Sequence, residues 1–182
     1  MNSDNKGFLT NGKGMNAVFA AVLIALLTAA DQWTKAISAE KLKNEPYVLI
    51  RGVLEFRYLE NHGMAFSLLQ NQMTFFFIGT VVFFSVALYF WFRLPKTRKM
   101  RWLRLILIVL AAGGLGNFID RCRFRYVRDF IYFSLIDFPI FNVADIFVTV
   151  SATVLVLLIL FYYKDEDFEG VMKKREKGSP DK

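Results

Sequence analysis

An uncharged stretch of membrane-spanning length is the feature that most constrains the fold of this chain. From Asn61 through Phe92 there is no Lys, Arg, Asp or Glu. A helix needs roughly 20 predominantly apolar residues to cross the hydrocarbon core of a bilayer, so residues 73–92 are predicted to form a transmembrane helix. Three other apolar runs predict further spans, at about 15–35, 103–119 and 141–163. We therefore expect an all-α membrane protein with four transmembrane helices.

Composition agrees with this class. Of 182 residues, 55% are hydrophobic and 21% are charged, which is too apolar for an ordinary soluble domain. The net charge is +7, but Lys and Arg lie between the apolar runs instead of along one face. That distribution is typical of topology determinants and indicates no nucleic-acid partner. The single cysteine, Cys122, excludes an internal disulfide and is given no role.

The first apolar run has a second interpretation, as a secretory signal peptide. Basic residues precede it, and it contains the small-residue pattern Thr28-Ala29-Ala30. The helical pattern nevertheless continues through Asp31 to Lys35, and three more spans follow. We therefore interpret this run as the first transmembrane helix.

The connection from Arg93 to Arg104 predicts the orientation. It carries six basic residues and no acidic one, which places it in the cytoplasm by the positive-inside rule. Both termini are then cytoplasmic, with flexible tails at 1–14 and 164–182. The extracytoplasmic side holds two connections, at 36–72 and 120–140.

The first outer connection has the pattern of a small β-sheet. Tyr47 to Ile50 is β-branched and aromatic, and Leu54, Phe56 and Tyr58 alternate with charged residues at the period of a half-buried strand. Open sheet edges are not tolerated in lipid. We therefore expect this sheet to rest on the membrane surface.

Four aspartates are predicted to share one depth at the outer ends of the helices: Asp31, Asp120, Asp129 and Asp145. A charged side chain costs ~3 kcal/mol at mid-bilayer and less near the ends, so such groups usually mark function. An ion or proton path would need carboxylates staggered through the bilayer. A cluster in one layer favours chemistry on a molecule that reaches the interface from the membrane.

Elimination narrows that chemistry. The lone histidine, His62, is insufficient for a His-rich metal site, and there is no glycine-rich phosphate loop, so neither metal nor cofactor is expected. A serine–lysine pair is conceivable between Lys35 and Ser38 or Ser67, but Lys35 lies one turn after Asp31 and is expected to pair with it. Paired carboxylates remain. When two share one proton, the charged one activates water and the protonated one donates to a carbonyl.

Five sequence blocks resemble the lipoprotein signal peptidase family, also called signal peptidase II. They are Asp31-Gln32-x-x-Lys35, Asn61-x-Gly63-x-Ala65-Phe66-Ser67, Gly116-Asn117-Phe118-Ile119-Asp120-Arg121, Val127-Arg128-Asp129-Phe130 and Phe141-Asn142-Val143-Ala144-Asp145. The resemblance covers residues from about 15 to 163, in the family's order. It implies an aspartic endopeptidase of the bacterial inner membrane that removes the signal peptide from prolipoproteins, cutting before a diacylglyceryl-modified cysteine. It also implies an extracytoplasmic β-cradle, and lipid-modified prolipoproteins and membrane lipids as partners.

The resemblance also implies site residues. The catalytic pair falls on Asp129 and Asp145. The supporting and substrate-binding positions fall on Asp31, Lys35, Asn61, Gly63, Asn117, Asp120, Arg121 and Asn142. We interpret Asp120 as the residue that orients Arg121. It is a rival to Asp129 for the catalytic role, but an aspartate beside an arginine is poorly suited to exchange protons near neutral pH, whereas Arg128 in an extended segment faces away from Asp129.

Two departures from the family pattern concern the loop before Asp129. A glycine is usual where this chain has Arg125-Tyr126, and Arg128 replaces a valine. The alternative function is a small transporter or channel subunit whose aspartates and arginines line a conducting path, and a non-catalytic scaffold is a third.

Overall fold

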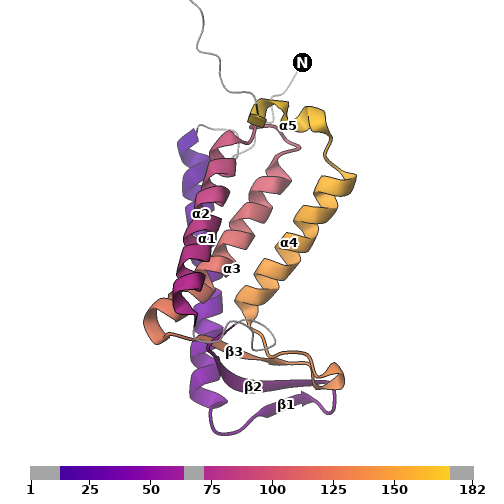
Figure 1. Cartoon of the computed structure of the whole chain (residues 1–182). Coiled ribbons are helices and arrows are strands. Elements are labelled where there is room, and N and C mark those ends of the chain that lie inside the picture. The colour runs from indigo at the N-terminus through magenta and orange to yellow at the C-terminus, as the bar shows by residue number, and fades with distance from the viewer. Residues whose placement is uncertain (1–12, 64–71, 173–182) are drawn as a thin grey trace, which may run out of the picture.

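Four long helices and a small sheet make up the computed structural model, which describes residues 13–63 and 72–172 (Figure 1). The elements in chain order are α1 (Lys13–Lys41), β1 (Tyr47–Ile50), β2 (Leu54–Asn61), α2 (Met73–Arg93), α3 (Arg101–Phe124), β3 (Val127–Tyr132), the 3-10 helix η3 (Ser134–Ile136), α4 (Val143–Phe161) and α5 (Asp165–Met172). The first four α-helices are long and apolar enough to cross a membrane. The predicted fold class, four transmembrane helices with a small sheet, is confirmed.

Two helices continue beyond their predicted ends. Helix α1 reaches Lys41 instead of stopping near Lys35, because the residues that follow are good helix formers and no glycine or proline occurs before Pro46. Helix α3 continues past residue 119 to Phe124 and is followed by its C-cap, Arg125, whose φ of 69° is left-handed. Glycine is favoured in that conformation, so the Arg125 departure places a non-glycine residue at a helix end that suits glycine.

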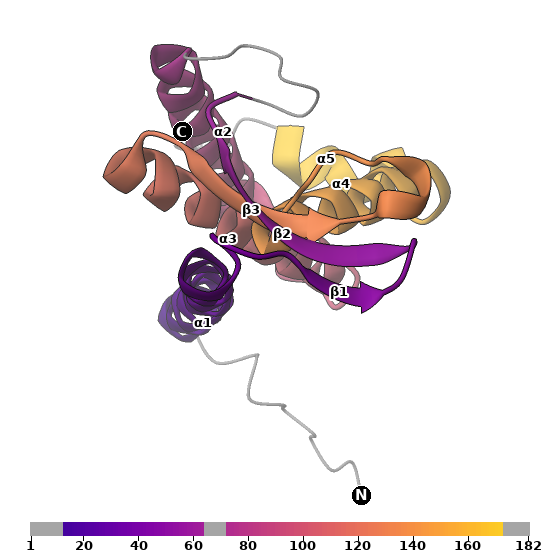
Figure 2. The ribbon, with the colours of Figure 1, turned by 90° about the horizontal axis from the view of Figure 1, so that it is seen from below.

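The sheet contains one more strand than predicted. Strands β1 and β2 lie where the alternation indicated, and β3, from the second outer connection, completes an antiparallel sheet of order β1-β2-β3. Leu59 is opposite Asp129, and Asn61 is opposite Val127. The sheet lies across one end of the helices (Figure 1), and Figure 2 shows it from below with β1 at its edge. It therefore brings Asn61 and Asp129 to the helix ends.

Small residues allow α1, α3 and α4 to approach closely above the sheet. A Cβ atom added at Gly113 would lie 2.6 Å from the Ala144 carbonyl oxygen. One added at Gly116 would overlap the Asp31 carboxylate and lie 3.3 Å from the Ala144 Cβ. Small residues are typical of such contacts between membrane helices, and here they bring three polar helix ends together.

The opposite end of the bundle is closed by α5, in a region expected to be a flexible tail. Leu94, Met100, Leu103 and Tyr163 form a buried cluster there. The Lys99 ammonium pairs with Asp167 of α5, and the Tyr163 hydroxyl donates to the Lys99 carbonyl oxygen at 3.1 Å. The first part of this tail is thus an ordered helix attached to the α2–α3 connection.

Candidate active site

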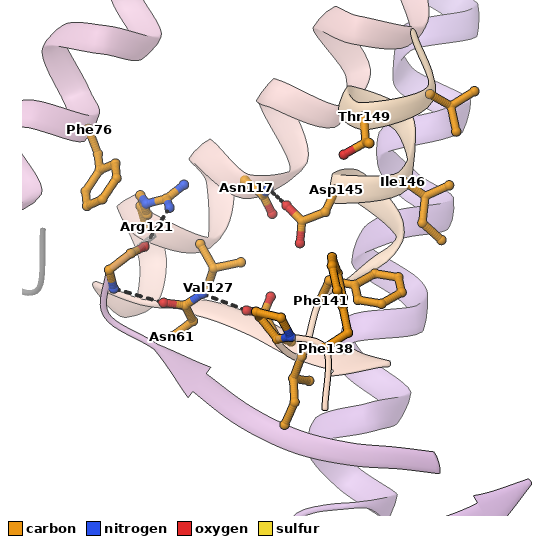
Figure 3. A pocket seen from close by; sticks show the side chains of 15 residues that line it. Asn61, Phe76, Asn117, Arg121, Val127, Phe138, Phe141, Asp145, Ile146 and Thr149 are labelled. Atoms are coloured by element: carbon orange, nitrogen blue, oxygen red, sulfur yellow. Dashed lines mark hydrogen bonds between the residues drawn. The ribbon is translucent and has the colours of Figure 1, made fainter. Parts of the chain in front are cut away.

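A buried carboxylate, Asp129, and a half-buried one, Asp145, face one cavity at the sheet end of the helices. Asp129 lies in the middle of β3, and Asp145 lies in the first turn of α4. Both line a cavity of about 590 Å³. Figure 3 shows Asn117 and Asp145 on facing helices at this cavity, with Asn61 and Arg121 beside them. The structure therefore brings together the two aspartates that the resemblance indicated.

Asn142, the N-cap of α4, connects the two carboxylates. Its side-chain Nδ2 donates to Asp129 Oδ1 at 2.6 Å, and its backbone N–H donates to Asp145 Oδ2 at 3.0 Å. Its Oδ1 accepts from the Asp145 backbone N–H at 3.0 Å, which completes a capping box. The start of one helix thus positions both aspartates.

Two more asparagines hold the remaining carboxylate oxygens. Asn61 Nδ2 donates to Asp129 Oδ2 at 2.8 Å, and Asn117 Nδ2 donates to Asp145 Oδ1 at 2.7 Å. Each carboxylate therefore accepts two N–H hydrogen bonds. Amide donors orient a carboxylate and favour its ionised form, but they bring no positive charge of their own.

Electrostatics favour one protonated and one ionised carboxylate in this pair. Burial, and then the nearby Asp145 carboxylate, raise the pKa of Asp129 from 3.8 to about 7. Asp129 is 1% exposed, so water screens its charge weakly. Below neutral pH Asp129 is therefore protonated, which is the condition required of an acid beside an ionised base.

A buried ionic cluster supports the carboxylate pair from α1, α3 and β3. The Lys35 ammonium lies 3.0 Å from Asp31 and 3.5 Å from Asp120, and all three side chains are fully buried. Arg128 donates to Asp120 through Nη2 at 2.7 Å and Nε at 3.2 Å. Gln32 Nε2 donates to Asp120 at 3.0 Å. Two cations balance two carboxylates, so this cluster carries no net charge.

The expected pairing of Asp120 with Arg121 is wrong. Asp120 is held by Arg128 and Lys35, while Arg121 Nη2 donates to the Gly63 carbonyl oxygen at 3.4 Å and its guanidinium lies 4.3 Å from the centre of the Phe76 ring. The side chains of successive residues in a helix point about 100° apart, so Asp120 and Arg121 do not face each other. Arg121 therefore faces the cavity, as a substrate-contacting residue would.

Sequence reasoning missed two groups of residues at this site. It gave Arg128 and Gln32 no role, although the predicted orientation of Arg128 away from Asp129 is borne out by its contacts with Asp120. It also missed the apolar cavity wall, formed by Phe76, Val127, Phe138, Pro139, Ile140, Phe141, Ile146 and Val150. Val127 and Phe141 stand in the sequence blocks quoted above, but the other residues of this wall carry no signal in the sequence that separates them from other apolar residues.

The serine–lysine alternative finds no support at Ser38, whose hydroxyl donates to the Lys35 backbone carbonyl at 2.9 Å. Ser67, with Ala65 and Phe66 of the same motif, lies outside the described residues. The His62 ring packs 5.3 Å from the Tyr126 ring. Within residues 13–63 and 72–172, no three His, Cys, Asp or Glu side chains converge as metal ligands.

Comparison with known proteins gives consistent matches. The family model described as "Signal peptidase (SPase) II" matches residues 23–161. A lipoprotein signal peptidase of Streptococcus thermophilus (strain CNRZ 1066) is 43% identical over 154 residues, covering 84% of this chain and 97% of the relative. One of Streptococcus pyogenes serotype M5 (strain Manfredo) is 40% identical over 146 residues, covering 80% and 93%.

Solved structures of bacterial membrane enzymes are also similar to this chain. One superimposes with a TM-score of 0.69 at 29% identity, covering 88% of this chain and 94% of that one. A second has a TM-score of 0.67 at 30% identity, covering 80% and 94%.

Proposed function

Because this chain belongs to the signal peptidase II family, we propose that it removes signal peptides from prolipoproteins by an aspartic mechanism. The observation that carries the proposal is the pair Asp129 and Asp145, which line one cavity and are joined through Asn142. Hydrolysis by such a pair requires one protonated and one ionised carboxylate, and the pKa of about 7 at Asp129 supports that state.

The proposed reaction uses only these two acids and water. The ionised Asp145 carboxylate takes a proton from a water molecule while the water oxygen attacks the scissile carbonyl carbon. Asp129 gives its proton to the carbonyl oxygen. The tetrahedral intermediate then collapses. Asp145 gives its proton to the leaving nitrogen as the carbon–nitrogen bond breaks, and Asp129 recovers a proton from one of the two hydroxyls of the intermediate, which leaves a neutral carboxylic acid and an amine.

We assign the supporting residues two roles in this reaction. Asn61, Asn117 and Asn142 orient the carboxylates through the hydrogen bonds described above. Arg121 and Gly63 line the same cavity, and the Arg121 guanidinium, one nitrogen of which donates to the Gly63 carbonyl oxygen, has further N–H donors for the substrate backbone. The buried ionic cluster, which includes Asp31, Lys35 and Asp120, supports this arrangement and does not contact the substrate.

The proposed cleavage point precedes a diacylglyceryl-modified cysteine. The cavity opens among apolar side chains at one end of four membrane-spanning helices, and Phe138, Ile146 and Val150 belong to its wall. An apolar wall beside a polar catalytic pair suits a substrate that is lipid on one side of the bond and peptide on the other.

We further propose that the chain lies in the cytoplasmic membrane with both termini inside and the carboxylate pair at the outer surface. The support is the basic connection between α2 and α3, which lies at the end of the bundle opposite the sheet (Figure 1). A transporter or channel is less well supported, because the buried charges of Asp31, Lys35, Asp120 and Arg128 compensate one another in one layer.

A cleavage assay tests the proposed function. The purified protein in detergent is incubated with a diacylglyceryl-modified precursor, and mass spectrometry follows the loss of the signal peptide. The same precursor without the lipid is the control. Cleavage before the modified cysteine, with little cleavage of the control, supports the proposal. A folded protein that leaves the lipidated precursor intact contradicts it.

A further inference from the structure

A second, largely apolar cavity lies between α3 and α4, with a volume of about 400 Å³. Its wall includes Trp102, Leu105 and Val109 from α3, Val154 and Leu158 from α4, and Tyr162, which directly follows α4. The Ser151 hydroxyl in this wall donates to backbone carbonyls of its own helix, including that of Val148 at 3.2 Å, so it requires no polar ligand. The cavity is suited to a flexible hydrocarbon chain.

Two arginines continue this wall at the end of the bundle away from the carboxylate pair. Arg101 precedes Leu105 by four residues, which is the spacing of one helix face, and Arg98 lies in the turn just before α3, where its carbonyl oxygen accepts the Arg101 backbone N–H at 3.3 Å. Both side chains are exposed, and neither has an acidic partner within the part of the chain that the structure describes. Their charge is therefore available to a ligand.

Two other cations of the same connection, Lys99 and Arg104, are already engaged. Lys99 pairs with Asp167, and Arg104 Nη2 donates to the Leu94 carbonyl oxygen at 2.6 Å. Trp102 and Tyr162, which are 59% and 45% exposed, lie on the two sides of the cavity. Such amphipathic rings are enriched at the level of lipid headgroups. The arginines therefore lie where the cavity meets the headgroup region.

We propose that the α3–α4 cavity holds an acyl chain of an anionic phospholipid whose phosphate pairs with Arg98 and Arg101. The apolar cavity suits a hydrocarbon chain within the membrane, and the two arginines suit a negative charge at its surface. An anionic phospholipid has both. Basic pockets between transmembrane helices on the cytoplasmic side are suited to such headgroups. A zwitterionic lipid offers the same chain but brings a positive group to the two arginines.

Charge argues against the signal peptide as the occupant, a point that rests on the proposed function. A signal peptide has a basic segment before its apolar core. If its cleavage site lies at Asp129 and Asp145, its basic end reaches the opposite end of the bundle. A helix in the α3–α4 cavity would then place Lys or Arg against Arg98 and Arg101, and like charges repel.

Native mass spectrometry of the detergent-purified protein tests the lipid site, with phosphatidylglycerol and phosphatidylcholine of identical chains as probes. We expect one phosphatidylglycerol to be retained in preference to phosphatidylcholine. Arg98→Gln and Arg101→Gln should each weaken that binding roughly fivefold, since a basic residue near the surface contributes about 1 kcal/mol. Lys96→Gln removes one charge from the same connection and should change binding less than twofold.

Two substitutions test the cavity itself. Val154→Trp and Val109→Trp fill it without altering charge, and each should remove the retained phosphatidylglycerol from a protein that still gives a helical circular dichroism spectrum. Equal retention of both lipids, equal effects of Lys96→Gln and Arg101→Gln, or unchanged retention in both tryptophan variants would overturn the proposal.

The cleavage assay separates this proposal from the proposed function. If Val154→Trp slows precursor cleavage while phosphatidylglycerol binding is unchanged, the cavity belongs to the signal peptide and the lipid site is refuted. If the lipid preferences are as expected but no precursor is cleaved, the lipid site stands and the peptidase proposal fails.

Discussion

The buried Lys35 ammonium donates a hydrogen bond to the side-chain oxygen of Asn117 at 2.8 Å. Because that oxygen is engaged by a cation, the amide nitrogen of Asn117 points the other way and donates to Asp145 at 2.7 Å. Through Asn117, Lys35 thus connects the neutral ionic cluster to the carboxylate pair. If the side-chain oxygen and nitrogen of Asn117 exchanged places, the hydrogen bonds to Lys35 and to Asp145 would both be lost.

Asn117→Ala should therefore impair catalysis more than folding. It removes a charge-assisted hydrogen bond worth ~1.5 to 3 kcal/mol, so kcat should fall roughly 10- to 100-fold with a smaller change in KM. Asn44→Ala, at an exposed position before β1, is the matched control. Steady-state kinetics with a lipidated precursor gives both constants, and an unchanged kcat in Asn117→Ala would contradict this orientation role.

Gly116→Ala should destabilise the protein. The added methyl group overlaps the Asp31 carboxylate, whose other oxygen accepts the Ala144 backbone N–H at 2.9 Å at the start of α4. Overpacking of this kind costs about 1 to 3 kcal/mol. Gly79→Ala in α2 has nothing within 4 Å and should be neutral or mildly stabilising. Thermal unfolding in detergent compares the two, and equal shifts would disprove the close approach.

The sequence predicted contacts at this site only where the two residues are close together in one helix or one strand. Asp31 and Lys35 are four residues apart on one helix, so their pairing followed from helix geometry, and the structure confirms it at 3.0 Å. Alternation along a strand likewise predicted that Arg128 and Asp129 point to opposite faces. Local patterns of this kind need no knowledge of the tertiary fold.

The partner of Asp120 was beyond such patterns. Its cation, Arg128, is eight residues away and comes from β3, after a helix end at Arg125 that the sequence does not mark with glycine. The joining of β3 to β2 and the closure of the bundle by α5 also depend on tertiary packing. The catalytic assignment of Asp129 and Asp145 and the orientation in the membrane stay predictions.

The pH dependence of cleavage should have an alkaline limb near neutrality. Burial, and then Asp145, raise the pKa of Asp129 to about 7, so the protonated acid is lost as the pH rises through that value. We expect kcat/KM for the lipidated precursor to fall above about pH 7. A rate that keeps increasing well above this pH would show that Asp129 is not the acid.

The same shift predicts an effect on stability. The folded protein holds the Asp129 proton more tightly than the unfolded chain does, so the stabilisation is complete below the ordinary pKa of 3.8 and is lost as the pH rises through about 7. Asp129→Asn should remove this part of the pH dependence, which denaturation at several pH values measures.

Labelling of single cysteines tests the orientation. In a Cys122→Ser background, cysteines at Lys43 and Phe133, near the sheet, should react with an impermeant reagent from outside the intact membrane. A cysteine at Lys96, in the basic connection, should react only after the membrane is opened. Reversed labelling would contradict the outer location of the site.

The central claim is that Asp129 and Asp145, and not Asp120, form the catalytic pair. The most direct measurement is the rate of cleavage of a lipidated precursor by Asp129→Asn, Asp145→Asn and Asp120→Asn, each shown to be folded and membrane-inserted. Loss of an acid or base should reduce turnover by about a thousandfold or more in the first two variants. Asp120→Asn leaves Arg128 and Lys35 less compensated, so it should lower stability and activity while turnover remains detectable. A folded Asp120→Asn without activity, together with an Asp129→Asn that still cleaves, would contradict the account.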